Sequence, residues 1–149
     1  MTTSTLYAQA VPYLAFDGNC AEAMRFYAKV LGGKLEVMTN GQSPFAVQMP
    51  KEHLQRVMHA RLFLPNGATI FAGDCPASTP YAGIHGVMVV LNFETVAQAE
   101  RAFNGLAEDG KINMPIGESF WAKRFGMLID KFGCPWGING ELLDFQMPI

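Results

Sequence analysis

The chain has few charged residues and no run of basic ones. Only 16% of its 149 residues are Asp, Glu, Lys or Arg, and 11 basic against 13 acidic side chains give a formal net charge of −2. Proteins that bind nucleic acid or a membrane surface usually carry a concentrated basic patch, so we expect neither partner. Half of the residues are hydrophobic, which excludes a mainly disordered chain and favours one compact, soluble domain.

Cysteine is scarce, and long apolar segments are missing. The three cysteines form no CxxC pair, and their odd number does not suit a secreted disulfide scaffold. Residues 1–11 lack the basic and apolar sections of a signal peptide. The uncharged stretch 63–73 is too short, and too rich in Pro, Asn and Gly, to cross a bilayer. These observations predict a cytoplasmic protein.

Two segments carry the signals of amphipathic helices. The first begins at Asn19, where Glu22 is placed to complete a capping box, and it ends at Gly32-Gly33. The second begins at Thr95, with a glutamine in the matching place, and closes at Gly110. Apolar side chains recur at helical spacing in both segments, so each helix is expected to cover one face of a sheet.

Strand-like runs account for much of the remaining chain. Two turn sequences, Pro65-Asn66-Gly67 and Asp130-Lys131-Phe132-Gly133, predict hairpins between neighbouring runs. The predicted strands lie at residues 11–16, 35–39, 57–64, 68–72, 87–93, 125–129 and 135–139.

The order of these elements repeats in two halves. Each half contains a strand, a capped helix, a Gly-Lys step, a second strand and a hairpin. We assign module one to about residues 11–74 and module two to about residues 85–146, with the Pro- and Gly-containing segment 73–84 as the connection. Neither half can bury both faces of its sheet alone, so the two sheets are expected to cooperate around a shared concavity.

A series of short motifs along the chain carries a family resemblance. The motifs are Pro12–Cys20, Phe26-Tyr27, His59-Ala60, Glu118–Lys123, Phe125-Gly126, Asp130–Gly133 and Pro135-Trp136. With the repeat, they resemble the vicinal oxygen chelate superfamily, which includes glyoxalase I, extradiol dioxygenases and bleomycin-binding proteins, and within it the PhnB-like branch. The resemblance implies an α+β fold of two βαβββ modules that form a cup, as a homodimer.

Members of the PhnB-like branch have often been labelled demethylubiquinone methyltransferases. No strand of this chain is followed by the Gly-rich loop that a nucleotide-derived cofactor usually requires. We therefore expect no cofactor.

In the metal-using members of the superfamily, four ligands line the cup, one from each of four strands. Alignment on the Phe-Tyr motif, the turns and the repeat places these positions at Pro12, Phe71, Met88 and Gly137. Divalent metals bind imidazole nitrogen and carboxylate oxygen, which these four residues lack. The sequence therefore predicts a cup without a catalytic metal.

The alternation of side chains along strands predicts what lines the cup instead. In module one the inward set is His59, Arg61, Phe63 and Phe71; in module two it is Met88, Trp121, Lys123, Phe125 and Met127, with Asn92 and Asn139 nearby. An aromatic, methionine-rich lining with a few cationic donors suits a planar or partly apolar ligand that carries an anionic group. A register slip of one residue would invert every assignment.

His59 and Glu118 are the candidate proton-transfer groups, His59 because imidazole titrates near neutral pH. Each also has a structural alternative, as a hydrogen-bonding strand residue or as a loop carboxylate bonded to backbone. Arg61 and Lys123 are either substrate clamps or solvated or paired cations, and Trp121 is either a ligand contact or a core or interface anchor.

Three functions remain open. The first is a metal-free protein that binds and sequesters a small molecule, and the second is a cofactor-independent isomerase or lyase that uses His59 or Glu118. The third is a metalloenzyme of the glyoxalase or dioxygenase kind, whose ligands the alignment misplaced.

Overall fold

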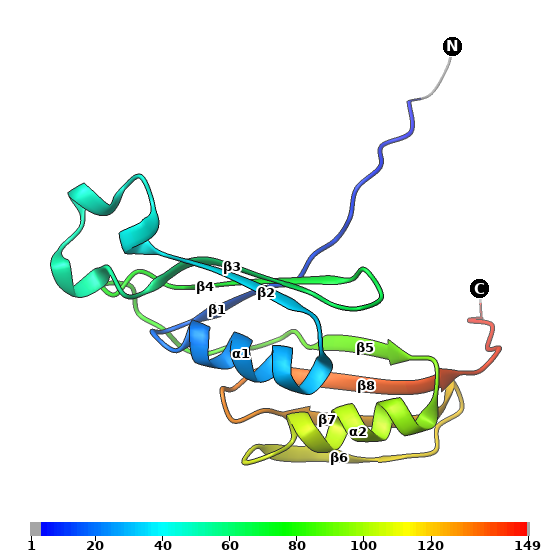
Figure 1. Cartoon of the computed structure of the whole chain (residues 1–149). Coiled ribbons are helices and arrows are strands. Elements are labelled where there is room, and N and C mark those ends of the chain that lie inside the picture. Colours follow the sequence, from blue (N-terminus) through cyan, green and yellow to red (C-terminus); the bar gives the residue numbers. More distant parts are fainter. Residues whose placement is uncertain (1–3, 149) are drawn as a thin grey trace.

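Two four-stranded sheets, each with one long helix, make up most of residues 4–148, the part of the chain that the computed structural model describes (Figure 1). In spatial order, sheet A contains β1 (Tyr13–Phe16), β4 (Thr69–Asp74), β3 (Val57–Phe63) and β2 (Lys34–Thr39), with α1 (Cys20–Leu31). Sheet B contains β5 (Val89–Phe93), β8 (Pro135–Leu142), β7 (Ala122–Ile129) and β6 (Lys111–Gly117), with α2 (Val96–Leu106). Three short 3-10 turns, at Asn40–Gln42, Ala46–Gln48 and Lys51–His53, separate β2 from β3.

The two sheets have the same topology. In each, the first and last strands of the module pair in parallel (β1 with β4, β5 with β8), and the remaining pairs are antiparallel. This confirms the α+β fold of two βαβββ modules. None of the helices in residues 4–148 is long and apolar enough to span a membrane.

The two helices begin where the sequence predicts, but only one uses the expected cap. The Thr95 side chain accepts from the backbone N–H of Gln98 at 3.1 Å, as an N-cap does. The Asn19 side chain makes no such bond, so the expected capping box there is wrong. Asp74 replaces it, because pairing of β1 with β4 brings the Asp74 carboxylate to the backbone N–H groups of Gly18 and Cys20 at 2.8 and 3.1 Å.

Several predicted boundaries shift because pairing decides where a strand ends. β7 begins at Ala122 rather than residue 125, and β8 runs to Leu142 rather than residue 139, since Ala122 pairs with Leu142 across the two strands. A hydrophobic pattern does not predict these two extensions, because they contain the charged residues Lys123, Arg124 and Glu141. α2 ends at Leu106, before a turn that reaches the predicted stop at Gly110.

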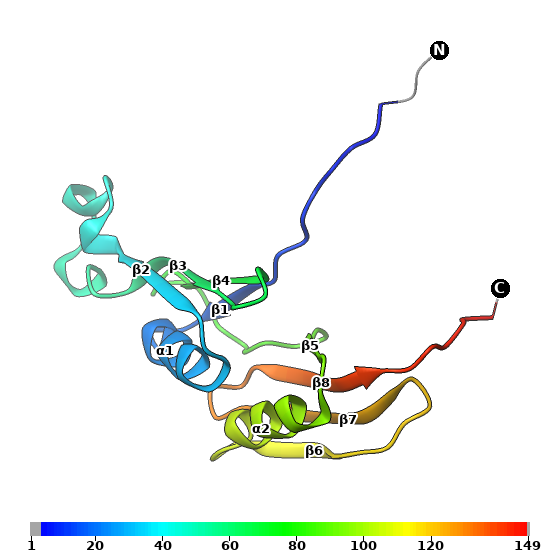
Figure 2. The ribbon, with the colours of Figure 1, turned by 45° about the vertical axis from the view of Figure 1, so that its right-hand side comes forward.

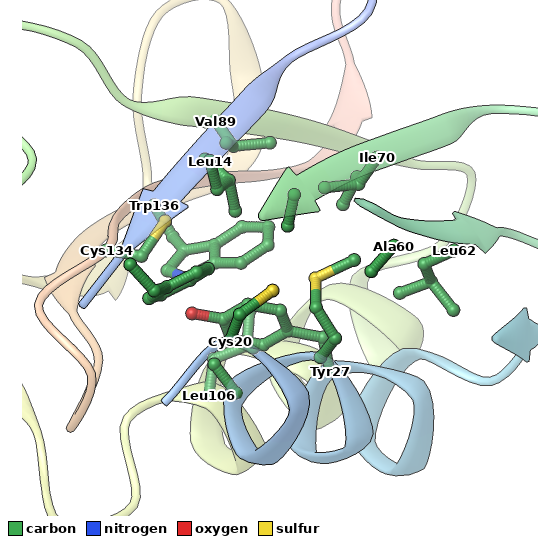
Figure 3. Close-up of a cluster of buried hydrophobic side chains, with 14 of the residues drawn as sticks. Leu14, Cys20, Tyr27, Ala60, Leu62, Ile70, Val89, Leu106, Cys134 and Trp136 are labelled. Carbon is green, nitrogen blue, oxygen red and sulfur yellow. The ribbon is translucent and has the colours of Figure 1, made fainter. Parts of the chain in front are cut away.

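The helix-covered faces of both sheets share one core (Figure 3). The Tyr27 ring of α1 lies 6.5 Å from Phe16 of sheet A and 5.1 Å from Trp136 of sheet B, measured between ring centroids. Val30 of α1 also packs against Gly105 of α2. Figure 2 shows the two helices, α1 on sheet A and α2 on sheet B. The faces without helices, called here the open faces, therefore lie on the outer sides of the two sheets, away from the core.

Candidate functional site

The open face of sheet A carries an aromatic cluster. Strand pairing sets Tyr13 beside Phe71 and Phe71 beside Arg61, while the alternate residues Leu14 and Leu62 are buried against α1. The residues on this face are Tyr13, His59, Arg61, Phe63 and Phe71. The structure therefore brings together the four residues that the sequence assigns to the cup from module one.

His59 is held within this cluster by two aromatic neighbours. Its ring stacks on Tyr13 with centroids 5.7 Å apart, and it meets Phe71 edge-on at 5.0 Å. His59 Nδ1 lies 3.5 Å from the Tyr13 hydroxyl. Burial, with a smaller contribution from Cys20, raises the pKa of Tyr13, so the phenol stays protonated and can donate to Nδ1.

The two cationic candidates are both paired on their own sheets. The Arg61 guanidinium lies 3.3 Å from the Glu36 carboxylate, and Lys123 Nζ lies 2.8 Å from the Glu141 carboxylate. The hydrogen bond from Lys123, followed by one from the backbone N–H of Val96, lowers the pKa of Glu141, which therefore remains charged. Arg61 and Lys123 thus each have a carboxylate partner on the same sheet.

The open face of sheet B combines aromatic rings with a chain of side-chain amides. Phe125 pairs with Asn139 across β7 and β8, and Asn139 pairs with Asn92 across β8 and β5. Trp121, just before β7, packs edge-on against Phe125 with ring centroids 4.9 Å apart. The indole of Trp121 donates to Asn139, which donates in turn to Asn92, each at 2.9 Å.

Met88 lies on the same open face of sheet B. A Cβ atom built on Gly137 would lie 3.1 Å from Met88 Cε, which shows that the methionine covers this glycine. Met127 pairs with Gly137 and shares its face by register. All the module-two residues assigned to the cup from the strands are therefore neighbours on one surface.

The two candidate proton-transfer groups do not meet in the chain. His59 is on β3 of sheet A, whereas Glu118 is exposed in the loop between β6 and β7 of sheet B. No hydrogen bond or ion pair within residues 4–148 links them. A mechanism that needs both groups at once would have to combine them from two copies of the chain.

One of the four expected ligand positions is wrong by a residue. Pro12 has the strand parity of the buried Leu14, whereas the residue beside Phe71 on the open face is Tyr13. Pro12 was placed by alignment on the Phe26-Tyr27 motif of the helix, which does not fix the parity of the strand before it: three residues, 17–19, connect β1 to α1, whereas two residues, 94–95, connect β5 to α2.

The corrected positions still do not fit a divalent metal. Tyr13 offers a phenol whose raised pKa disfavours the metal-binding phenolate, and Phe71, Met88 and Gly137 offer no nitrogen or carboxylate ligand. Within residues 4–148, no three His, Cys, Asp or Glu side chains are grouped as a metal site requires.

Two hollows in the described part of the chain are lined by other residues. One, of about 250 Å³, lies between residues 9–12, the β3–β4 hairpin and β5; another, of about 300 Å³, lies between the segment before β3 and residues 74–78. None of the nine predicted site residues lines either hollow. Neither hollow therefore contains a candidate that the sequence analysis names.

Sequence reasoning missed three residues that shape the site. Tyr13 was lost with the one-residue slip, although the alternation of exposed and buried residues from 13 to 16 follows the pattern of a strand. Glu36 and Glu141, the partners of the two cations, had no signal of their own, because they reach Arg61 and Lys123 only through strand pairing.

Comparison with known proteins identifies the family. The model of the Glyoxalase/Bleomycin resistance protein/Dioxygenase superfamily matches residues 9–138. The chain belongs to this superfamily. It is also 36% identical over 137 residues to the protein YjdN of Escherichia coli K12, covering 86% of this chain and 92% of that protein.

Two solved structures resemble this member of the superfamily closely. Protein PA1353 of Pseudomonas aeruginosa is 45% identical with a TM-score of 0.82, covering 91% of this chain and 98% of that one. A PhnB protein of Bacillus cereus, described as a putative 3-demethylubiquinone-9 3-methyltransferase, is 28% identical with a TM-score of 0.69, covering 89% and 98%. The PhnB-like resemblance seen in the sequence is thereby confirmed.

Proposed function

We propose that this protein binds a planar, largely apolar small molecule without a metal ion, in a cup that two copies of the chain complete together. The observation that carries the proposal is the composition of the open faces. Each presents a cluster of aromatic rings, around His59 in sheet A and around Trp121 in sheet B, with polar groups at fixed positions among them. Ligand sites of small-molecule-binding proteins have this mixture.

A second copy is needed because one chain leaves both faces uncovered. Tyr13 is 54% exposed, Met88 42% and Val90 45%, and all three lie on open faces. Apolar surface of this kind is typical of a protein or ligand contact. Placing sheet A of one copy against sheet B of another would cover both and would enclose a ligand between aromatic walls.

Metal-dependent chemistry is not supported by the residues. The positions that would hold a divalent ion carry a protonated phenol, a phenyl ring, a thioether and a glycine, so no Lewis acid or metal hydroxide is part of the proposal. The methyltransferase description of the Bacillus cereus protein is not carried over either, because this chain has no Gly-rich nucleotide loop.

A cofactor-independent isomerase or lyase is the second candidate. The contact between the Tyr13 hydroxyl and His59 Nδ1 favours it, because a hydroxyl that donates to Nδ1 orients the neutral imidazole and leaves the Nε2–H group as the proton donor for a proton-transfer step. Glu118 would join such a step only from the partner copy.

The first test is the assembly. Light scattering after size exclusion should give about twice the 16.3 kDa of one chain. A monomer at all concentrations would remove the shared cup. Protein treated with EDTA should then fail to bind Zn²⁺, Mn²⁺ or Fe²⁺ stoichiometrically, whereas tight binding of one ion per chain would overturn the metal-free proposal.

The second test is a thermal-shift screen of small aromatic molecules. A ligand at 100 times its dissociation constant should add about 2.7 kcal/mol of stability. Phe71→Ala should reduce that gain, whereas Val47→Ala, at a position 92% exposed outside the sheets, should not. A compound recovered unchanged supports binding, and turnover that is lost in His59→Ala supports the enzyme instead.

A further inference from the structure

The amide chain on sheet B ends in a hydrogen-bond donor. Trp121 Nε1 donates to Asn139 Oδ1, and Asn139 Nδ2 donates to Asn92 Oδ1. Asn139 is 7% exposed, whereas Asn92 is exposed at the edge strand β5. This series of hydrogen bonds therefore runs from the Trp121 ring, through the buried amide of Asn139, to the surface amide of Asn92.

The indole fixes the orientation of both amides. Indole N–H is a donor only, so Asn139 must present its oxygen to Trp121 and its NH₂ group to Asn92. Asn92 must then present its own oxygen to Asn139, which leaves its NH₂ group facing outward. No acceptor within residues 4–148 takes a hydrogen bond from this NH₂ group.

The charged donor on this face, the Lys123 ammonium group, already has a partner. Lys123 is paired with Glu141, and the Trp121 N–H is used by Asn139. Phe120 and Phe125 meet the Trp121 ring edge-on at centroid distances of 4.8 and 4.9 Å, which holds it in place. An aromatic surface thus lies beside the amides that end at the Asn92 NH₂ group.

We propose that Asn92 is the residue by which this face selects its ligand, and that the ligand is an aromatic ring bearing a carbonyl or carboxylate oxygen. The ring would pack against Trp121, and the oxygen would accept from Asn92 Nδ2. This inference rests on the proposed function, because it needs a small molecule bound at the open face. It goes further by excluding ligands that offer only donors at this point.

Two probes with the same ring separate these chemistries. 2-Naphthoate carries an acceptor, whereas 2-naphthylmethylammonium carries donors only. The chain has two tryptophans, so a ¹H–¹⁵N spectrum contains two indole signals. Trp121 reports the face, and Trp136, which is fully buried and bonded to Asp130, reports the core. Naphthoate should shift the Trp121 signal alone and bind at least about tenfold more tightly than the ammonium probe.

Substitutions at Asn92 should change this preference. Asn92→Asp puts acceptors in place of the donor and should weaken naphthoate binding about tenfold or more, while Asn92→Leu removes the donor without adding charge and should weaken it about threefold to tenfold. Asn104→Asp, at an exposed position of α2, introduces the same charge away from the face and should have no effect.

The outcomes distinguish the two proposals. If neither probe nor neutral 2-naphthylmethanol moves the Trp121 signal, small-molecule binding at this face is wrong. If both probes bind with equal affinity, the ligand-binding proposal is supported and selection by Asn92 is wrong. The same conclusion follows if both Asn92 variants still bind naphthoate more tightly than the ammonium probe. If Asn92→Asp also moves the Trp136 signal, that variant has disturbed the core, and the affinity of Asn92→Leu for naphthoate alone tests selection by Asn92.

Discussion

Within residues 4–148, one buried hydrogen bond between side chains connects the two modules, and its removal tests the account of the shared core. The Tyr27 hydroxyl of α1 donates to Asp130 Oδ2 at 2.5 Å, and both side chains are almost fully buried. Burial, with further contributions from Cys134 and Asp130, raises the pKa of Tyr27 well above its usual value, so the hydroxyl remains a donor. We expect Tyr27→Phe to destabilise the fold while leaving its architecture intact.

The expected loss follows from what Asp130 retains. Its carboxylate also accepts from Trp136 Nε1 at 2.8 Å and from the backbone N–H groups of Phe132 and Cys134 at 2.8 and 3.0 Å, so the charge keeps three donors. The phenyl ring preserves the aromatic contacts of Tyr27. A hydrogen bond to a charged group contributes about 1.5–3 kcal/mol, and we therefore expect a loss of about 2 kcal/mol in the free energy of unfolding.

Urea unfolding of both proteins at the same protomer concentration measures this loss. At a slope of about 2 kcal/mol per molar urea, the midpoint should fall by about 1 M with the slope unchanged. Tyr81→Phe is the matched control, since its hydroxyl donates at 2.7 Å to the neutral carbonyl of Ala15, and it should cost about 0.5–1 kcal/mol. A loss below about 0.5 kcal/mol for Tyr27→Phe, or one no larger than the control, would refute the reasoning.

Three further outcomes are expected. Asp74→Ala should cost about 1–2 kcal/mol in urea unfolding and Asn19→Ala less than about 0.5, because the carboxylate caps α1; equal losses would contradict this. Gly126→Ala should cost about 1–3 kcal/mol in the free energy of unfolding, because its Cβ atom would lie 2.9 Å from the backbone of Ile116. Gly137→Ala should cost under about 0.5 kcal/mol, because its Cβ atom would meet only the flexible end of Met88 and a methyl group of Val90. A larger loss for Gly137→Ala than for Gly126→Ala would show that the faces of sheet B are assigned wrongly. Burial raises the pKa of Cys20 to about 12 from 9.0, so only the unfolded chain ionises this thiol between those values. Stability should therefore fall as pH rises from 9 to 12, and less steeply in Cys20→Ala; equal slopes would exclude this thiol as the cause.

The face assignments show how far a strand pattern reaches. In β3, Ala60 and Leu62 are fully buried while Arg61 and Phe63 are exposed, so alternation alone predicts which side chains share a face. The position at Pro12 was wrong because it was aligned on a helix motif, and such an alignment does not carry into the preceding strand when the connecting loops differ in length. Hydrophobic periodicity records which face is covered, but it contains no information on loop length.

What the sequence determined by itself was local or patterned: the positions of α1 and α2, the cap at Thr95, the parity of the strands and the family. The tertiary structure alone decided the contacts between distant segments. Asp74 caps α1, Glu141 pairs with Lys123, and Tyr27 meets Asp130 from the other module. A propensity acts on neighbouring residues along the chain, whereas these partners lie far apart in sequence and become neighbours only after two sheets have paired and packed around a common core.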